Sequence, residues 1–272
     1  MNDLDRYLDF AKELAVEAGL IMKKYFQAQD IGLEIKADKT PLTLADTEVN
    51  SLVIKRVKER FPGHGVLGEE ESFGLESDNL WIVDPIDGTF NFSRRIPLFA
   101  FCLALATKGE LQAAAVYDPI MGRLLYASKG KGAYENGQKL DVSNKDFHGT
   151  VSISSWVVGG NQNSIFKDIS VHGKFADAYA RQGNIAEIEF PIAYAIAALG
   201  SSTLDGVVTG LTTPWDAATG SLIAMEAGAI VTDLYGNKIE YWHKNANGVL
   251  AAPPKTHKFL LETIQVALKD SR

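Results

Sequence analysis

Three short acidic segments stand out, because in each of them carboxylates lie at a predicted strand end or helix start. They are Gly68-Glu69-Glu70-Glu71, Asp84-Pro85-Ile86-Asp87-Gly88-Thr89 and Pro214-Trp215-Asp216. Each has an ordinary explanation when taken alone: a solvated acidic loop, a tight surface turn and an acid at a helix start. Carboxylate oxygens are also the ligands that hard divalent cations prefer, so the combination indicates a metal site.

The second segment carries the most chemical information. Four apolar residues, 80–83, predict a buried strand that ends at Asp84, and a turn can bring Asp87 beside it. Gly88 lets the backbone approach a ligand closely, and the amides of Gly88 and Thr89 could bind phosphate oxygens near a helix start. Carboxylates for a hard metal beside amides for an anion are what metal-assisted phosphate hydrolysis requires.

Other site chemistries have weaker support. The five histidines show no paired spacing typical of zinc ligands, and the chain has neither a Gly-x-Ser-x-Gly elbow nor a Walker A loop. The single cysteine, Cys102, excludes an internal disulfide and lies in an apolar run that favours a packed thiol.

The composition of the chain argues against nucleic acid and membranes as partners. The chain has 272 residues, 46% of them apolar and 22% charged, with a formal net charge of −7. Nucleic acid is not an expected partner, because binding to its phosphates requires a basic surface. No apolar run approaches the roughly 20 residues of a membrane span, and the N-terminus lacks the apolar region of a signal peptide. We therefore expect a cytoplasmic protein without a membrane partner.

Hydrophobic periodicity predicts an alternation of helices and strands. Helices are expected over residues 3–28, 44–61, 191–199, 216–227 and 254–268. Strands are expected over residues 66–67, 80–83, 98–107, 111–117, 123–127, 151–155, 204–209, 230–231 and 249–251, with a hairpin over 129–137 that turns at Asn136-Gly137. Two packed subdomains, 1–147 and 148–272, fit this pattern better than two independent domains.

The ordered motifs resemble those of the inositol monophosphatase family, within the lithium-sensitive, Mg²⁺-dependent phosphatases. The resemblance is carried by Gly68-Glu69-Glu70, by Trp81-Ile82-Val83-Asp84-Pro85-Ile86-Asp87-Gly88-Thr89-Phe90-Asn91-Phe92 and by Pro214-Trp215-Asp216-Ala217-Ala218. Supporting matches are Lys36, Asp38, Pro41-Leu42-Thr43, Asp46 and residues 130–137. Order and spacing agree over nearly the whole chain.

The resemblance implies a mixed α/β fold, an αβαβα sandwich of the sugar-phosphatase type, with the metal site between the subdomains. Two or three Mg²⁺ ions are implied. Glu69, Asp84 and the Ile86 carbonyl would hold the first, Asp84, Asp87 and Asp216 the second, and a third, weaker ion would sit near Glu69. The N-terminal subdomain would then supply most ligands, and the C-terminal one Asp216 and the substrate contacts.

The resemblance also implies catalytic roles. Thr89, hydrogen-bonded to Asp46, would position and deprotonate the attacking water together with Glu69, while Glu70 would lie just outside the ligands. The Gly88 and Thr89 amides would hold the phosphate. Water would attack phosphorus in line, without a covalent phosphoenzyme. Family members are commonly homodimers, so a homodimer is implied as well.

The substrate is less constrained than the reaction. Family members acting on inositol phosphate usually carry a Glu shortly before the Trp-Asp pair, and residues 207–214 contain none. Glu187 or Glu189 could supply the hydroxyl contact instead, or both could be loop charges. We expect Mg²⁺-dependent hydrolysis of a small phosphorylated metabolite, with inositol 1-phosphate as the first candidate.

Several alternatives remain open for the function. Related phosphatases act on histidinol phosphate, fructose 1,6-bisphosphate, sugar phosphates and 3′-phosphoadenosine derivatives. A non-catalytic, metal-binding regulatory protein is the alternative from another class.

Overall fold

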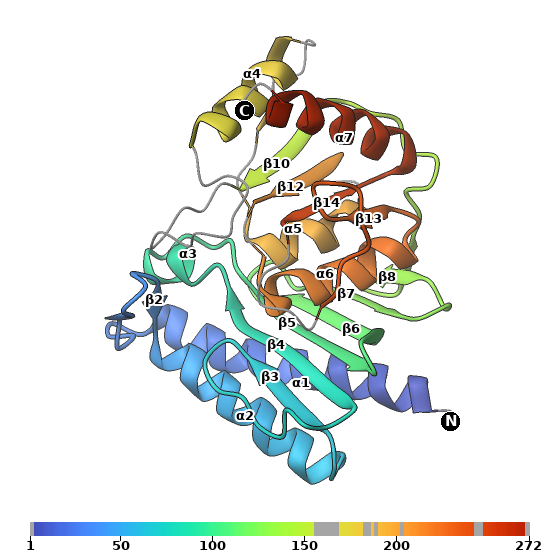
Figure 1. The fold of residues 1–272 in the computed structure, drawn as a ribbon. Coiled ribbons are helices and arrows are strands. Elements are labelled where there is room, and N and C mark those ends of the chain that lie inside the picture. The colour runs from blue at the N-terminus through green and yellow to red at the C-terminus, as the bar shows by residue number, and fades with distance from the viewer. Residues whose placement is uncertain are drawn as a thin grey trace.

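Five layers, helix–sheet–helix–sheet–helix, follow one another across the molecule (Figure 1). The computed structural model describes residues 3–154, 169–181, 186–187, 190–201, 204–210, 212–241 and 247–269. This arrangement confirms the αβαβα sandwich that the sequence motifs implied. Within the described ranges, no helix is long and apolar enough to cross a membrane.

The first sheet has seven strands, and it supplies two of the three acidic segments. Its order is β3 (Gly65–Gly68), β4 (Asn79–Asp87), β5 (Ala100–Thr107), β6 (Glu110–Asp118), β7 (Arg123–Ser128), β8 (Ala133–Glu135) and β9 (Gln138–Leu140). Only the β3–β4 pair is parallel. The predicted hairpin turn is confirmed at Asn136 and Gly137, whose φ angles are 48° and 85°.

Strand β4 continues four residues beyond its predicted end at residue 83. Its pairing with β5 becomes irregular between Asp84 and Asp87, which lie opposite Cys102 and Ala100. A bulged strand therefore carries both carboxylates, where we had expected a turn after the strand. Bulges re-aim side chains near functional sites, because the extra backbone on one strand breaks the regular alternation of faces.

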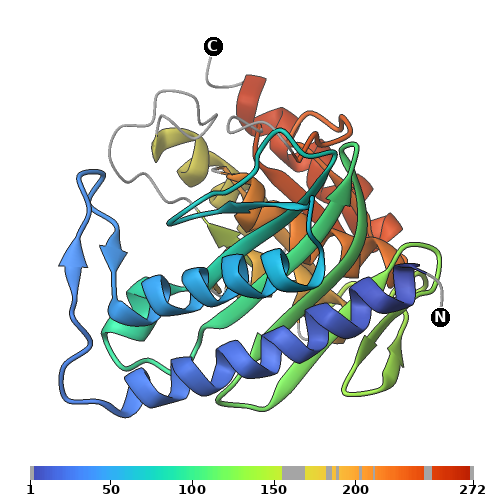
Figure 2. The same ribbon diagram turned by 90° about the horizontal axis from the view of Figure 1, so that it is seen from below.

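Two long helices cover the outer face of this sheet. Helices α1 (Asp3–Gln27) and α2 (Leu44–Arg60) lie side by side across it (Figure 2). A small antiparallel ribbon of β1 (Glu34–Ile35) and β2 (Pro41–Leu42) connects them. Both helices were predicted from their apolar periodicity, whereas the ribbon was not.

The second sheet has five strands and shares the central helix layer with the first. Its order is β11 (Ala186–Glu187), β10 (Thr150–Ser154), β12 (Gly206–Thr209), β14 (Val249–Ala252) and β13 (Ile230–Thr232). Helices α5 (Ile192–Ala198) and α6 (Pro214–Glu226) lie between the two sheets, and η1 (Leu199–Ser201) follows α5. Helices α4 (Ile169–Arg181) and α7 (Pro254–Lys269) cover the far face.

The central position of α5 and α6 explains their composition. Residues 193–198 of α5 and 217–224 of α6 are all buried, because sheets cover both sides of these helices. A helix that is apolar all round is typical of such an interior layer. Since both helices pack against both sheets, the division into subdomains 1–147 and 148–272 stays a prediction.

Candidate active site

Three carboxylates from two elements converge at the junction of the first sheet and the central helices. Asp84 and Asp87 come from β4, and Asp216 comes from the first turn of α6. One oxygen of each lies within 4.8 Å of the others. Asp84 and Asp87 are 3% and 4% exposed. The three residues of the second proposed metal site therefore come together in the folded chain.

The start of α6 fixes Asp216. Thr213 is the residue that caps the helix, and its hydroxyl donates to Asp216 Oδ2 at 2.7 Å, while Pro214 occupies the first turn. A proline there costs no hydrogen bond, because the first amides of a helix have no intrahelical partner. Asp216 therefore serves as an acid in a capping box as well as a member of the carboxylate cluster.

The cluster is unfavourable when all its members are ionised without a cation. Burial, reinforced by the charge of Glu69, raises the pKa of Asp84 well above its ordinary value. Burial and the neighbouring Asp216 raise the pKa of Asp87 in the same way, and burial raises the pKa of Asp216 to about 6. A hard divalent cation would relieve both the desolvation and the repulsion, so these oxygen donors fit Mg²⁺.

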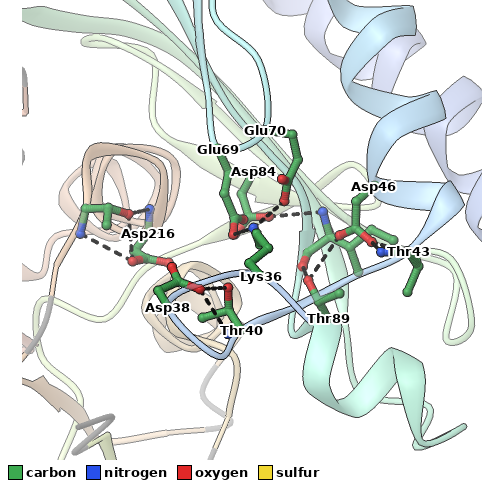
Figure 3. Close-up of polar contacts among 12 residues, drawn as sticks. Lys36, Asp38, Thr40, Thr43, Asp46, Glu69, Glu70, Asp84, Thr89 and Asp216 are labelled. Atoms are coloured by element: carbon green, nitrogen blue, oxygen red, sulfur yellow. Dashed lines mark hydrogen bonds and ion pairs between the residues drawn. The ribbon is translucent and has the colours of Figure 1, made fainter. Parts of the chain in front are cut away.

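Glu69 reaches the same region from the position directly after β3. Its amide donates to the Val83 carbonyl at 3.2 Å, which places it beside the strand that carries Asp84. Lys36, from the ribbon, lies between the acids: its Nζ is 3.0 Å from Glu69 Oε1 and 2.7 Å from Glu70 Oε1 (Figure 3). The ammonium group of Lys36 therefore pairs with Glu69 and Glu70, close to where a third ion was expected.

A second polar group joins Asp46, Thr89 and Ile86. The Thr89 hydroxyl lies 3.1 Å from Asp46 Oδ1 and 2.9 Å from the Ile86 carbonyl oxygen (Figure 3). Asp46 is fully buried in the first turn of α2, where its Oδ2 accepts from the Thr43 amide at 2.8 Å. Burial, the largest influence, raises the pKa of Asp46 to about 7. The Thr89–Asp46 contact that the family resemblance implied is present.

Gly88 links the metal cluster to the following short helix, α3 (Thr89–Ser93). Its φ of 95° lies in the left-handed region, and a Cβ atom would come within 2.7 Å of Pro191 Cγ and 3.1 Å of the Leu98 carbonyl oxygen. Both constraints require glycine here. Binding of phosphate by the Gly88 and Thr89 amides stays a prediction, as does the role of the Ile86 carbonyl as a metal ligand.

Three further residues were discussed from the sequence: Glu187 and Glu189 as substrate contacts, and Cys102 as a packed thiol. Glu189 and the side chain of Glu187 lie outside the described residues, although the Glu187 backbone belongs to β11. Cys102 is fully buried opposite Asp84, as expected of a packed thiol. Burial raises the pKa of Cys102, and the nearby carboxylates add to the effect, which disfavours a reactive thiolate.

The hydrogen bonds from α5 to the cluster were not predicted from the sequence. The amide of Tyr194, in α5, donates to Asp87 Oδ2 at 2.7 Å. A tyrosine inside an otherwise apolar helix was the available signal, because a buried hydroxyl needs a polar partner. The signal points to a polar network near this helix, but it does not identify Asp87.

Comparisons with known proteins find relatives over nearly the whole chain. The sequence model of the inositol monophosphatase family matches residues 3–269. A relative named fructose-1,6-bisphosphatase/inositol-1-monophosphatase, from Thermotoga maritima, is 31% identical over 250 residues, which are 91% of this chain and 93% of that protein. The Escherichia coli K12 protein named Nus factor SuhB is 30% identical over 268 residues, 97% of each chain.

The fold has a close structural counterpart. The solved structure of an IMPase from Thermotoga maritima superposes with a TM-score of 0.83 at 27% identity. The alignment covers 98% of this chain and 99% of that one. The likeness therefore extends through both sheets and all three helix layers.

Proposed function

The chain belongs to the inositol monophosphatase family, a family of phosphatases, and we propose that it hydrolyses a small phosphomonoester with Mg²⁺ as cofactor. The convergence of Asp84, Asp87 and Asp216 is the observation that carries the proposal. The Thr89–Asp46 pair beside it supports a hydrolytic reaction, because water must lose a proton to attack phosphorus.

The donors are divided between two cation positions. Glu69, Asp84 and the Ile86 carbonyl would hold one ion, and Asp84, Asp87 and Asp216 the other, with a weaker third position near Glu69. When bound, the ions supply a lowered pKa for the attacking water and stabilisation of the leaving oxygen. Glu70, paired with Lys36, holds that lysine against the cluster without being a ligand itself.

The protein residues orient the water and the phosphate. Ionised Asp46 accepts the hydrogen bond of the Thr89 hydroxyl, which leaves the Thr89 oxygen free to accept a hydrogen bond from water. A proton taken from that water by Thr89 would be matched by transfer of the hydroxyl proton of Thr89 to Asp46. The Gly88 and Thr89 amides would hold phosphate oxygens at the start of α3. Direct attack by water needs no phosphorylated side chain, and the only cysteine is buried and disfavoured as a thiolate.

The substrate class is a small phosphorylated metabolite, with inositol 1-phosphate tested first. The name of the Thermotoga maritima relative includes both inositol 1-phosphate and fructose 1,6-bisphosphate as substrates, so fructose 1,6-bisphosphate is tested beside it. Histidinol phosphate, other sugar phosphates and 3′-phosphoadenosine derivatives complete the panel. A cytoplasmic homodimer is part of the same proposal.

A phosphate-release screen tests the function. Purified protein is incubated with each phosphomonoester in the presence of Mg²⁺, of EDTA, or of Mg²⁺ with high lithium. We expect release with at least one substrate, loss of release in EDTA and inhibition by lithium. Release that persists fully in EDTA would contradict the metal assignment, and the absence of release from every substrate would contradict phosphatase activity.

A non-catalytic role is the second candidate, because the Escherichia coli relative is named a Nus factor. The residues retained in this chain favour catalysis: a binding protein has no need of Thr89 and Asp46 beside the carboxylates. The same screen separates the two, since a non-catalytic protein would bind Mg²⁺ without releasing phosphate.

A further inference from the structure

Tyr194 connects the carboxylate cluster to strands β6 and β7 of the first sheet. The residue is 1% exposed. Its amide donates to Asp87 Oδ2 at 2.7 Å, and its hydroxyl donates to Asp118 Oδ2 at 2.9 Å. One side chain and its own peptide group therefore link Asp87 in β4 to Asp118 at the end of β6.

The Tyr194 hydroxyl has two charged partners, Asp118 and Arg123. Asp118 is 1% exposed, and its Oδ1 accepts from the amides of Ile120 and Met121 at 2.8 and 2.9 Å, which fixes the carboxylate in the β6–β7 turn. Arg123, from β7, places Nη1 3.1 Å from the Tyr194 oxygen. Because the hydroxyl donates to Asp118 and accepts from Arg123, both of its polar capacities are used.

Arg123 is itself fixed and also reaches the end of α5. Its Nε donates to Glu135 Oε1 at 2.6 Å and its Nη2 to Glu135 Oε2 at 3.2 Å, a forked pair that restrains the guanidinium plane. Nη2 also donates to Ser201 Oγ at 2.7 Å. Arg123 therefore contacts Tyr194 within α5 and Ser201 in η1, which directly follows α5.

Helix α5 needs such an anchor because it is short. It has seven residues, and Pro191 at its N-terminal cap makes no side-chain capping bond. An isolated helix of this length is unstable in water, so its position depends on tertiary contacts. Apolar packing permits small sliding movements, whereas a hydrogen-bonded side chain defines one position.

We propose that Tyr194 is a positioning residue for cation binding. Its hydroxyl is held by Asp118 and Arg123 and fixes the position of α5. In that position the Tyr194 amide orients the Asp87 carboxylate. The inference rests on the proposed function, since it takes Asp87 as a metal ligand. Hydrogen bonds to ligating carboxylates set the orientation of the ligands, and their removal weakens metal affinity by about 10–100-fold.

The test measures cation affinity without substrate. Tyr194→Phe removes only the hydroxyl and keeps the ring. Mn²⁺ serves as a paramagnetic probe, and free Mn²⁺ is followed by electron paramagnetic resonance during titration of the metal-free, full-length protein. We expect Tyr194→Phe to bind Mn²⁺ about tenfold more weakly than the unmodified chain.

A matched control separates positioning from general stability. Tyr179, in α4, is another buried tyrosine, 3% exposed, on the far side of the second sheet from α5. Tyr179→Phe also removes one buried hydroxyl, and we expect unchanged Mn²⁺ affinity, with the Tm of both variants measured alongside. Equal affinity losses in both variants would overturn the inference in favour of a purely structural role.

The remaining outcomes are also decisive. Unchanged Mn²⁺ affinity in Tyr194→Phe, with the unmodified protein binding normally, overturns the inference and leaves the proposed function intact. An unmodified protein that does not bind Mn²⁺ overturns both. If Tyr194→Phe does not fold, Arg123→Lys is tested in its place. Lysine keeps the positive charge but cannot reach Glu135, Tyr194 and Ser201 together. A folded Arg123→Lys variant with normal Mn²⁺ affinity overturns the inference.

Discussion

The hydroxyl oxygen of Thr89 lies 3.1 Å from Oδ1 of Asp46, although 43 positions of sequence separate the two residues. Asp46 also accepts from the amide and the hydroxyl of Thr43, so its carboxylate accepts from three donors. Only the ionised carboxylate accepts at all these positions. Since burial raises the pKa of Asp46 to about 7, its charge changes within the working range of most enzymes.

Removal of the Thr89 hydroxyl should abolish most of the turnover. We expect Thr89→Val to lower kcat by about 10²-fold or more, because a positioned proton acceptor contributes about 10²–10⁴-fold to catalysis. Thr89→Ser, which keeps the hydroxyl, should retain most of the activity. Initial rates of phosphate release with the best substrate of the screen check this; equal rates in the Val and Ser variants would exclude the role.

The rate should rise with pH as Asp46 loses its proton. We expect the midpoint at or below about pH 7, because bound cations favour the ionised carboxylate. The measurement is kcat across the pH range at saturating Mg²⁺. In Asp46→Asn this rise should disappear together with most of the activity, and a rise that persists in the variant would assign it to another group.

Asp87→Asn should abolish turnover while leaving the fold intact. The variant removes a buried carboxyl group whose ionisation is opposed by burial and by the charge of Asp216, so the Tm in EDTA should equal or exceed that of the unmodified protein. Calorimetric titration should show weakened Mg²⁺ binding. Glu110→Gln removes an acid that is exposed and paired with Lys129, and it should leave turnover unchanged. Near-normal turnover in Asp87→Asn would refute the assignment of this carboxylate.

The stabilisation by Mg²⁺ should grow with pH. The raised pKa values of Asp84, Asp87 and Asp216 mean that the folded, metal-free chain keeps protons that the unfolded chain has released. The contribution of these groups to metal-free stability is therefore greatest at low pH. It is lost as pH rises from the ordinary carboxyl pKa through the folded one, about 6 for Asp216.

Magnesium reverses this loss, because it binds the ionised carboxylates. The difference in Tm between samples with Mg²⁺ and with EDTA should increase from about pH 5 to about pH 8. Thermal unfolding at a series of pH values measures it. The use of a difference cancels titrations elsewhere in the protein, and a constant or shrinking difference would contradict the site.

The carboxylate of Glu226 should stabilise the fold from outside the site. It accepts from the amides of Gly130 and Gly132 at 2.7 and 2.8 Å, which ties the end of α6 to the β7–β8 turn. Glu226→Ala should lower the free energy of unfolding by about 1–3 kcal/mol, because both amides lose a charged acceptor. Urea unfolding in EDTA measures this without a contribution from metal.

Lys131 provides the control for Glu226, because it lies between the two glycines on the same turn. It forms an ion pair with Asp5, and both side chains are about 40% exposed. Lys131→Met should cost about 0.5 kcal/mol or less, as is usual for exposed ion pairs. A larger cost for Lys131→Met than for Glu226→Ala would show that the turn is stabilised through its surface and not through α6.

The chemistry of the site is a local property of the sequence. Asp84, Asp87 and Thr89 lie within six residues at the end of an apolar strand, and Asp216 follows Pro214 at a helix start, so short-range patterns locate them. The long helices α1 and α2 could be predicted for the same reason: one apolar face repeated over many residues is a strong signal.

Short elements gave weaker signals. The two-residue strands of the β1–β2 ribbon and the five-residue helix α3 contain too few residues for a period. The bulge in β4 also went unpredicted, because a proline after Asp84 is equally compatible with a turn. Such segments take their conformation from the neighbours that pack against them.

By itself, the sequence determined which residue types are available for metal and phosphate chemistry and the order in which the main helices and strands appear. Only the tertiary structure decided that Lys36 pairs with Glu69 and Glu70, and that the Tyr194 amide meets Asp87 across 107 positions. The physical reason is that local preferences act over a few residues. Contacts between distant segments depend on how the sheets and helices bury their apolar surfaces together.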